Sequence, residues 1–160
     1  MLPQNRPFAT CEARGLAGGG MGRFSDRGEK NAMTQAVENW IAVAKGGRLD
    51  DIPALLAEDA VFESPVVHTP QAGRDKAATY LQGAVVVLNN GTFEYLNEWR
   101  ATGSAVLEFT AVIDGITING VDLIWWNEAG LITRFKVMIR PLKAINLLHQ
   151  KMGEMLAKLG

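Results

Sequence analysis

The sequence predicts an α+β fold in which helices cover one side of a strongly curved antiparallel sheet and enclose a cone-shaped space. Three observations support this class. Apolar residues repeat at helical spacing early in the chain, from Val37 to Ala44. Four strand-like segments joined by short turns then follow, and an amphipathic stretch ends the chain. Helices segregated to one side of a curled sheet leave a concave space of the kind that binds small ligands.

Three helices and one short strand are expected before the four strands. Thr34 is a suitable N-cap for the first helix. A short helix over residues 50–56 follows, and a third helix covers residues 73–88. Between these two, residues 59–64 read as a strand that Pro65 ends or places on an edge.

The second half of the chain reads as an antiparallel meander with an added C-terminal helix. The strands are expected near residues 92–100, 104–114, 117–127 and 131–140, with hairpin turns between them. In the last strand, the residues expected on the face away from the core are Ile132, Arg134, Lys136, Met138 and Arg140. Residues 142–159 form an amphipathic helix whose apolar stripe covers either the mouth of the cone or a partner subunit.

Composition excludes several classes of function. The formal net charge of −1 does not resemble the basic surface of a nucleic-acid binder. Cys11 is the single cysteine, so no intrachain disulfide or multi-thiolate zinc site is possible. His68 and His149 lack metal-ligand spacing, and no organic cofactor is implied. No apolar run is long enough to span a membrane, and a cytoplasmic location is the expectation.

Residues 1–32 differ in composition from the rest, since they are rich in glycine and poor in periodic apolar residues. We interpret them as a disordered tail, or as the product of a translation start placed too far upstream, with Met33 as the sensible start. Residues 33–160 then form a single domain, a suitable length for one hydrophobic core.

Asp122 is the most informative residue because it interrupts a strand of aliphatic and aromatic residues. A carboxylate in such a place must be paired, kept neutral or left facing a cavity, since burying a bare charge is costly. Strand alternation turns Ile124 and Trp126 inward with Asp122, and turns Leu123 and Trp125 outward. We take Asp122 as the candidate acid of a pocket; the alternative is a structural acid bonded to a tyrosine or a backbone amide.

Four segments carry a resemblance to a known superfamily. They are LLAEDAVFESP at residues 55–65, GRDK at 73–76, VDLI at 121–124 and EAGLI at 128–132. With the first helix they resemble the nuclear-transport-factor-2-like superfamily, in its SnoaL-like and ketosteroid-isomerase-like branch, over roughly residues 34–140. The resemblance implies the cone-shaped fold, also called a cystatin-like roll. It identifies an activity poorly, because this fold hosts enzymes, binders and dimerisation modules.

The resemblance to ketosteroid isomerases extends to one catalytic position. Asp122 matches their oxyanion-stabilising aspartic acid, which an apolar site keeps protonated so that it donates a hydrogen bond. Their helical tyrosine corresponds to Trp40, and their general base corresponds to Ser64. Because a lone hydroxyl is a poor base, the known isomerase mechanism is not expected here. The Asp-Arg-Asp arrangement of the epoxide-hydrolase branch is not matched either.

Other residues complete the expected pocket and surface. His68, in a loop near the cavity mouth, is a candidate base, although a lone loop histidine is more often solvent-exposed. Tyr80, on the third helix, is a candidate hydrogen-bond donor. The expected pocket-lining residues are Trp40, Phe62, Ser64, Ile124, Trp126 and Phe135. Glu108 should face outward, and Trp125, Val112 and Met138 suggest an apolar outer sheet surface that forms a homodimer.

Two functional hypotheses follow. The first is a cofactor-independent, SnoaL-like enzyme of the isomerase, cyclase or lyase type that acts on a small, largely apolar carbonyl compound. The second is a non-enzymatic module that binds a small ligand or dimerises, with the C-terminal helix plugging the cone. A cavity left open beside Asp122 favours the first, and a helix that fills the cone favours the second.

Overall fold

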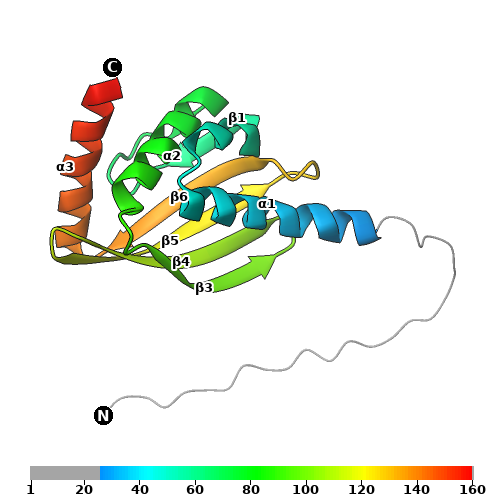
Figure 1. Ribbon diagram of the computed structural model, residues 1–160. Coiled ribbons are helices and arrows are strands. Elements are labelled where there is room, and N and C mark those ends of the chain that lie inside the picture. The colour runs from blue at the N-terminus through cyan, green and yellow to red at the C-terminus, as the bar shows by residue number, and fades with distance from the viewer. Residues whose placement is uncertain (1–25, 160) are drawn as a thin grey trace, which may run out of the picture.

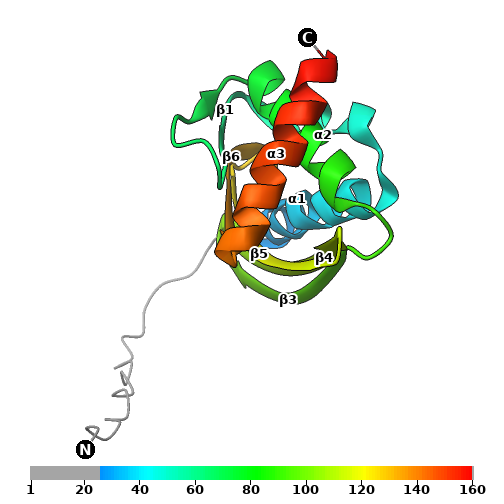
Figure 2. The ribbon, with the colours of Figure 1, turned by 90° about the vertical axis from the view of Figure 1, so that its left-hand side faces the viewer.

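The computed structural model describes the backbone of residues 26–159 and the side-chain environment of residues 35–157. It consists of one curved sheet with helices on its concave side (Figures 1 and 2). The expected tail therefore lies mostly outside the described residues, as does Cys11. The expected α+β class, with a curved sheet, N-terminal helices and a C-terminal helix, is confirmed.

The sheet has six strands in the order β2-β1-β6-β5-β4-β3. Their bounds are β1 Leu56–Glu63, β2 Gln71–Ala72, β3 Glu94–Ala101, β4 Ser104–Ile113, β5 Ile116–Trp126 and β6 Ile132–Arg140. The expected meander is present as β3 to β6, but the sheet is not wholly antiparallel, because β1 pairs parallel with β6. This pairing joins segments far apart in the sequence, so local patterns do not reveal it.

The helices are α1 Asp26–Gly46, α2 Arg74–Leu88 and α3 Leu142–Leu159. The first helix begins eight residues before the expected cap at Thr34, so the prediction of its start is wrong. The short helix expected at 50–56 is instead two 3-10 turns, Leu49–Asp51 and Pro53–Leu55, since Pro53 cannot continue the hydrogen bonding of the first. No described helix is long and apolar enough to cross a membrane.

Strand alternation places the core on the concave face. Leu107, Phe109 and Ala111 of β4 are fully buried, while Glu108 between them faces outward as expected. One expectation for β6 is wrong: Ile132 is buried rather than outward-facing. A register shift between Trp125 and Trp126 of the partner strand breaks the alternation at this point, so Ile132 packs beside β1.

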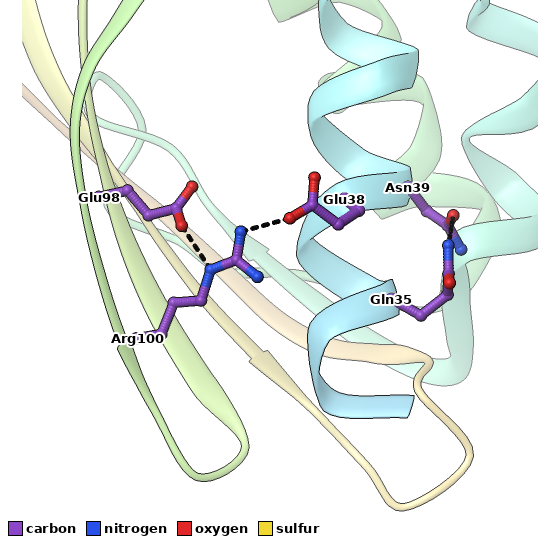
Figure 3. Close-up of polar contacts among 5 residues, drawn as sticks. All are labelled: Gln35, Glu38, Asn39, Glu98 and Arg100. Atoms are coloured by element: carbon purple, nitrogen blue, oxygen red, sulfur yellow. Dashed lines mark hydrogen bonds and ion pairs between the residues drawn. The ribbon is translucent and has the colours of Figure 1, made fainter. Parts of the chain in front are cut away.

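An ion pair connects the edge strand β3 to the first helix. Arg100 of the edge strand β3 forms an ion pair with Glu38 of α1 at 2.6 Å (Figure 3). The same guanidinium binds Glu98, which holds it in place on the strand. These pairs are partly exposed, so each stabilises the fold only modestly. Their structural consequence is to keep β3 folded over α1.

Gly120 of β5 allows Phe109 to lie across the concave face. A Cβ atom at this position would come within 2.5 Å of the Phe109 ring and 2.8 Å of the Met138 carbonyl oxygen. We expect Gly120→Ala to lower the free energy of unfolding by about 1–3 kcal/mol, because the added methyl group overpacks the core. Urea denaturation measures this change.

The control is Gly153→Ala in α3, where a Cβ atom would meet nothing within 4 Å. Alanine at this exposed helical position should raise stability by up to about 1 kcal/mol. Equal effects of the two substitutions would contradict the close approach at Gly120.

Candidate ligand-binding site

A cavity lies between the concave face of the sheet and the three helices. Its wall is almost entirely apolar, and its polar lining residues are Ser64, Asn89, Tyr95 and Asp122. Helix α3 contributes Leu148 and Met152 to the wall, so the C-terminal helix borders the cavity without filling it. The aromatic lining residues are Trp40, Phe62, Phe93, Tyr95 and Phe135.

Asp122 lies on the inner face of β5, in the centre of the sheet. It pairs with Leu107 on one side and Val137 on the other, and it is 5% exposed. Ile124 and Trp126 are buried with it, whereas Leu123 and Trp125 are only partly buried, so the expected orientation of this strand is confirmed.

A chain of hydrogen bonds ends on this carboxyl group. The indole Nε1 of Trp40 donates to Tyr95 Oη at 2.9 Å, and Tyr95 Oη donates to Asp122 Oδ2 at 2.8 Å. An indole N–H can only donate, so the phenol oxygen accepts and its own proton is directed to Asp122. Oδ2 is therefore an acceptor. When Asp122 is neutral, its proton belongs on Oδ1, which receives no side-chain hydrogen bond from the described residues.

The surroundings of Asp122 favour its neutral form. Burial raises the pKa of Asp122 from 3.8 to about 7, and the hydrogen bond from Tyr95, together with the nearby Trp40 indole N–H that donates to Tyr95, limits the rise. Burial and the neighbouring Asp122 raise the pKa of Tyr95 well above 10, so the phenol stays protonated. Below about pH 7 most molecules thus contain a carboxylic acid that can donate a hydrogen bond to a ligand.

The remaining polar lining residues have different partners. Asn89, at the end of α2, donates to the carbonyl oxygens of Ala44 and Lys45, which ties α2 to α1. Ser64 Oγ accepts the backbone N–H of Val66 at 3.2 Å. Among the described residues, no cluster of three histidine, cysteine or acidic side chains is placed to bind a metal ion.

The structure brings together some of the expected site residues. The cavity lining includes Asp122 and four of the other expected pocket residues, Trp40, Phe62, Ser64 and Phe135. Ile124 and Trp126 are buried in the core but do not line the cavity, because they lie farther along β5, beyond Asp122.

The two other candidate catalytic residues lie away from Asp122. His68 is exposed in the loop between β1 and β2. Tyr80 packs against Phe62, with ring centroids 6.0 Å apart, and does not line the cavity. No contact links either residue to Asp122, and their catalytic roles stay predictions.

Sequence reasoning missed Tyr95, the direct partner of Asp122. Its strand was expected, and Phe93 and Tyr95 occupy alternate positions that share a face. That alternation could have marked both as inward-facing. The register shift after Tyr95, which pairs Tyr95 with Phe109 but Asn97 with Glu108, obscures the pattern in the rest of the strand.

Comparison with known proteins places this site in a family context. A model of the SnoaL-like domain matches residues 37–135. A steroid delta-isomerase from Pseudomonas aeruginosa is 31% identical, with a TM-score of 0.76 over 80% of this chain and 93% of the isomerase. A cystatin-like-fold protein from Silicibacter pomeroyi is 32% identical, with a TM-score of 0.73 over 79% of this chain and 88% of that protein.

A more distant likeness supports the fold alone. An NTF2-like protein from Mesorhizobium loti is 20% identical, with a TM-score of 0.62 over 73% of this chain and 96% of its own. None of the curated proteins matches this chain.

The pKa of Asp122 can be measured by carbon-13 NMR of the labelled carboxyl group, with Asp122→Asn to assign the signal. We expect a value of about 7 in the native protein. Tyr95→Phe should raise it further, because it removes a hydrogen bond that favours the ionised form. Tyr80→Phe is the control, since it removes a phenol that does not contact Asp122. A native value near 4 would mean that Asp122 is an ionised structural carboxylate.

Proposed function

The chain belongs to the SnoaL-like domain family, and we propose that it binds a small, largely apolar carbonyl compound through neutral Asp122. The observation that carries this proposal is a buried carboxyl group in an otherwise apolar cavity, with Oδ2 bound by Tyr95 and Oδ1 without a side-chain partner among the described residues. A carbonyl oxygen accepts the hydrogen bond from Asp122, and the rest of the ligand contacts the aromatic and aliphatic wall. A charged ligand would lose hydration there with little compensation.

The same hydrogen bond supports a chemical role. Charge develops on a carbonyl oxygen when a proton leaves the neighbouring carbon, and a preorganised donor stabilises the resulting enolate. Asp122 would thus act as the acid of a cofactor-independent isomerase or cyclase, with water as the proton acceptor, since no lining side chain among the described residues is a base. The 31% identity to a protein described as a steroid delta-isomerase supports a cyclic ketone as the compound class.

The alternative is a non-enzymatic ligand-binding module. It is supported by the absence of a second carboxyl or a histidine among the described residues that line the cavity. Ser64 stands where the resemblance places a base, and Glu63 points to the other face, where it pairs with Arg134 and Lys136. A cavity with an acid but no base polarises a carbonyl group without removing a proton.

We further propose that a second copy of the chain packs on the convex face of the sheet. No described helix covers this face (Figure 2). Its centre is the outer patch, formed by Trp99, Val106, Val121, Leu123 and Met138, with Trp99 56% and Met138 57% exposed. Register places Trp99, Val106 and Leu123 in one row across three strands.

The area and charge of this face suit a homodimer. Four strands of eight to eleven residues, spaced about 4.8 Å apart, form a face of about 600 Å² if it is treated as flat. That approaches the roughly 800 Å² per partner of a stable interface. The face carries both signs of charge, since Glu108 lies beside Val121 and Lys136 lies beside Leu123, so two copies can pair without net repulsion.

The affinity for a carbonyl ligand should fall as the pH rises above the pKa of Asp122. We expect the affinity for 2-cyclohexen-1-one, measured by ligand-observed NMR, to be constant below pH 6 and to fall about tenfold per pH unit above pH 7, because ionised Asp122 cannot donate. Asp122→Asn should remove this dependence, since an amide does not titrate. Affinity that rises above pH 7 would exclude a neutral acid as the ligand donor.

Deuterium exchange at the carbon next to the carbonyl group of the bound ketone distinguishes the enzyme from the non-enzymatic binding module. Exchange that is lost in Asp122→Asn supports catalysis, whereas binding without exchange supports the ligand-binding module.

Oligomeric state tests the proposal for the convex face. Sedimentation velocity of the full chain should give a dimer, and Met138→Glu should dissociate it, because a charge would be buried at the centre of the interface. The matched control is Leu142→Glu on α3, which is 71% exposed and lies outside the outer patch. A monomeric wild-type protein would rule out the second copy.

A further inference from the structure

Ser64 follows the end of β1 and lines the same cavity as Asp122. Asp122 of β5 pairs with Val137 of β6, and the last pair between β6 and β1 is Lys136 with Glu63, so continuing this register by one residue puts Ser64 and Asp122 in one row with Val137. All three residues of the row line the cavity. Two strand spacings separate the backbones of Ser64 and Asp122 by about 10 Å.

Each end of this row has a hydrogen-bond donor available. Ser64 Oγ accepts the N–H of Val66, and no described residue accepts the proton of the hydroxyl group. Neutral Asp122 offers its proton from Oδ1, since Oδ2 is engaged by Tyr95. The amide of Asn89 is already engaged with the carbonyl oxygens of α1. Val137 between the two donors is apolar, so the donors are placed to contact opposite ends of a ligand.

We propose that the ligand is a compact compound with two acceptor oxygens, of the diketone or keto-ester type, bound by Asp122 at one end and by Ser64 at the other. This inference rests on the proposed carbonyl-binding function and narrows its ligand class. Ser64 selects the ligand by donating to the second oxygen. It needs no adjacent base for this role, which accounts for a serine in the place of a catalytic carboxylate.

Two probes of similar size test the second contact: 1,4-cyclohexanedione has an acceptor at each end of the ring, and cyclohexanone has one. Dissociation constants are measured at pH 6 by ligand-observed NMR on the full chain. We expect the dione to bind the wild-type protein roughly fivefold more tightly than the monoketone. About twofold of this gain reflects its two equivalent carbonyl groups, and the rest comes from one added hydrogen bond.

Ser64→Ala should weaken dione binding to the level of that statistical gain and leave cyclohexanone binding unchanged. Ser104→Ala, at the start of β4 and outside the cavity lining, is the matched control and should change neither. An equal effect of Ser64→Ala on both probes, or no effect on either, would overturn the role of Ser64.

The two levels of the proposal fail differently. If cyclohexanone binds with the expected pH dependence but Ser64→Ala does not discriminate between the probes, the second contact is wrong and the carbonyl site stands. If neither probe binds the wild-type protein, both proposals fall.

Discussion

The site depends on one constraint, which is that the carboxyl group of Asp122 is buried in the concave face of an apolar sheet. Ionising it there is costly: the rise of its pKa from 3.8 to about 7 corresponds to about 4 kcal/mol at 1.36 kcal/mol per pKa unit. Because folding raises the pKa of Asp122, the contribution of this group to the free energy of unfolding is greatest below about pH 4. That stability is lost as the pH rises through 7. The fold therefore gives up some stability at neutral pH to hold an acid in the cavity.

The elements around Asp122 are arranged to limit this cost. Trp40 comes from α1, Tyr95 from the edge strand β3, and both reach Asp122 in the middle of the sheet. Arg100 pairs β3 with Glu38 of α1 and so keeps the two donors on facing elements (Figure 3). The outer ion pairs are weak individually, but they position a buried network in which each hydrogen bond counts for more.

Local patterns were sufficient to predict the parts of this site that depend on alternation within one strand. Asp122 faces inward because its strand has a period of two, and the same alternation separates Phe135 from Arg134 and Lys136 on β6. It failed where pairing is irregular or non-local. The shift that buries Ile132, the bulge after Tyr95 and the parallel pairing of β1 with β6 all arise from neighbouring strands. The prediction that α1 starts at Thr34 failed for another reason. Thr34 is a suitable cap residue by type, but it lies inside a helix that begins at Asp26.

Trp40 and Ser64 explain how a shared fold acquires a different polar lining. A tyrosine in place of Trp40 could donate or accept a hydrogen bond, whereas the Trp40 indole only donates. The Tyr95 oxygen must therefore accept from Trp40, and Tyr95 donates its own proton to the Asp122 carboxyl group. A carboxylate in place of Ser64 would stand about 10 Å from Asp122 along the row and oppose its ionisation. With serine there, the pKa of Asp122 is raised by burial alone. In the proposed site, the lining thus combines the acid Asp122 with a second donor, Ser64, and such a pair is better suited to holding two oxygens than to removing a proton.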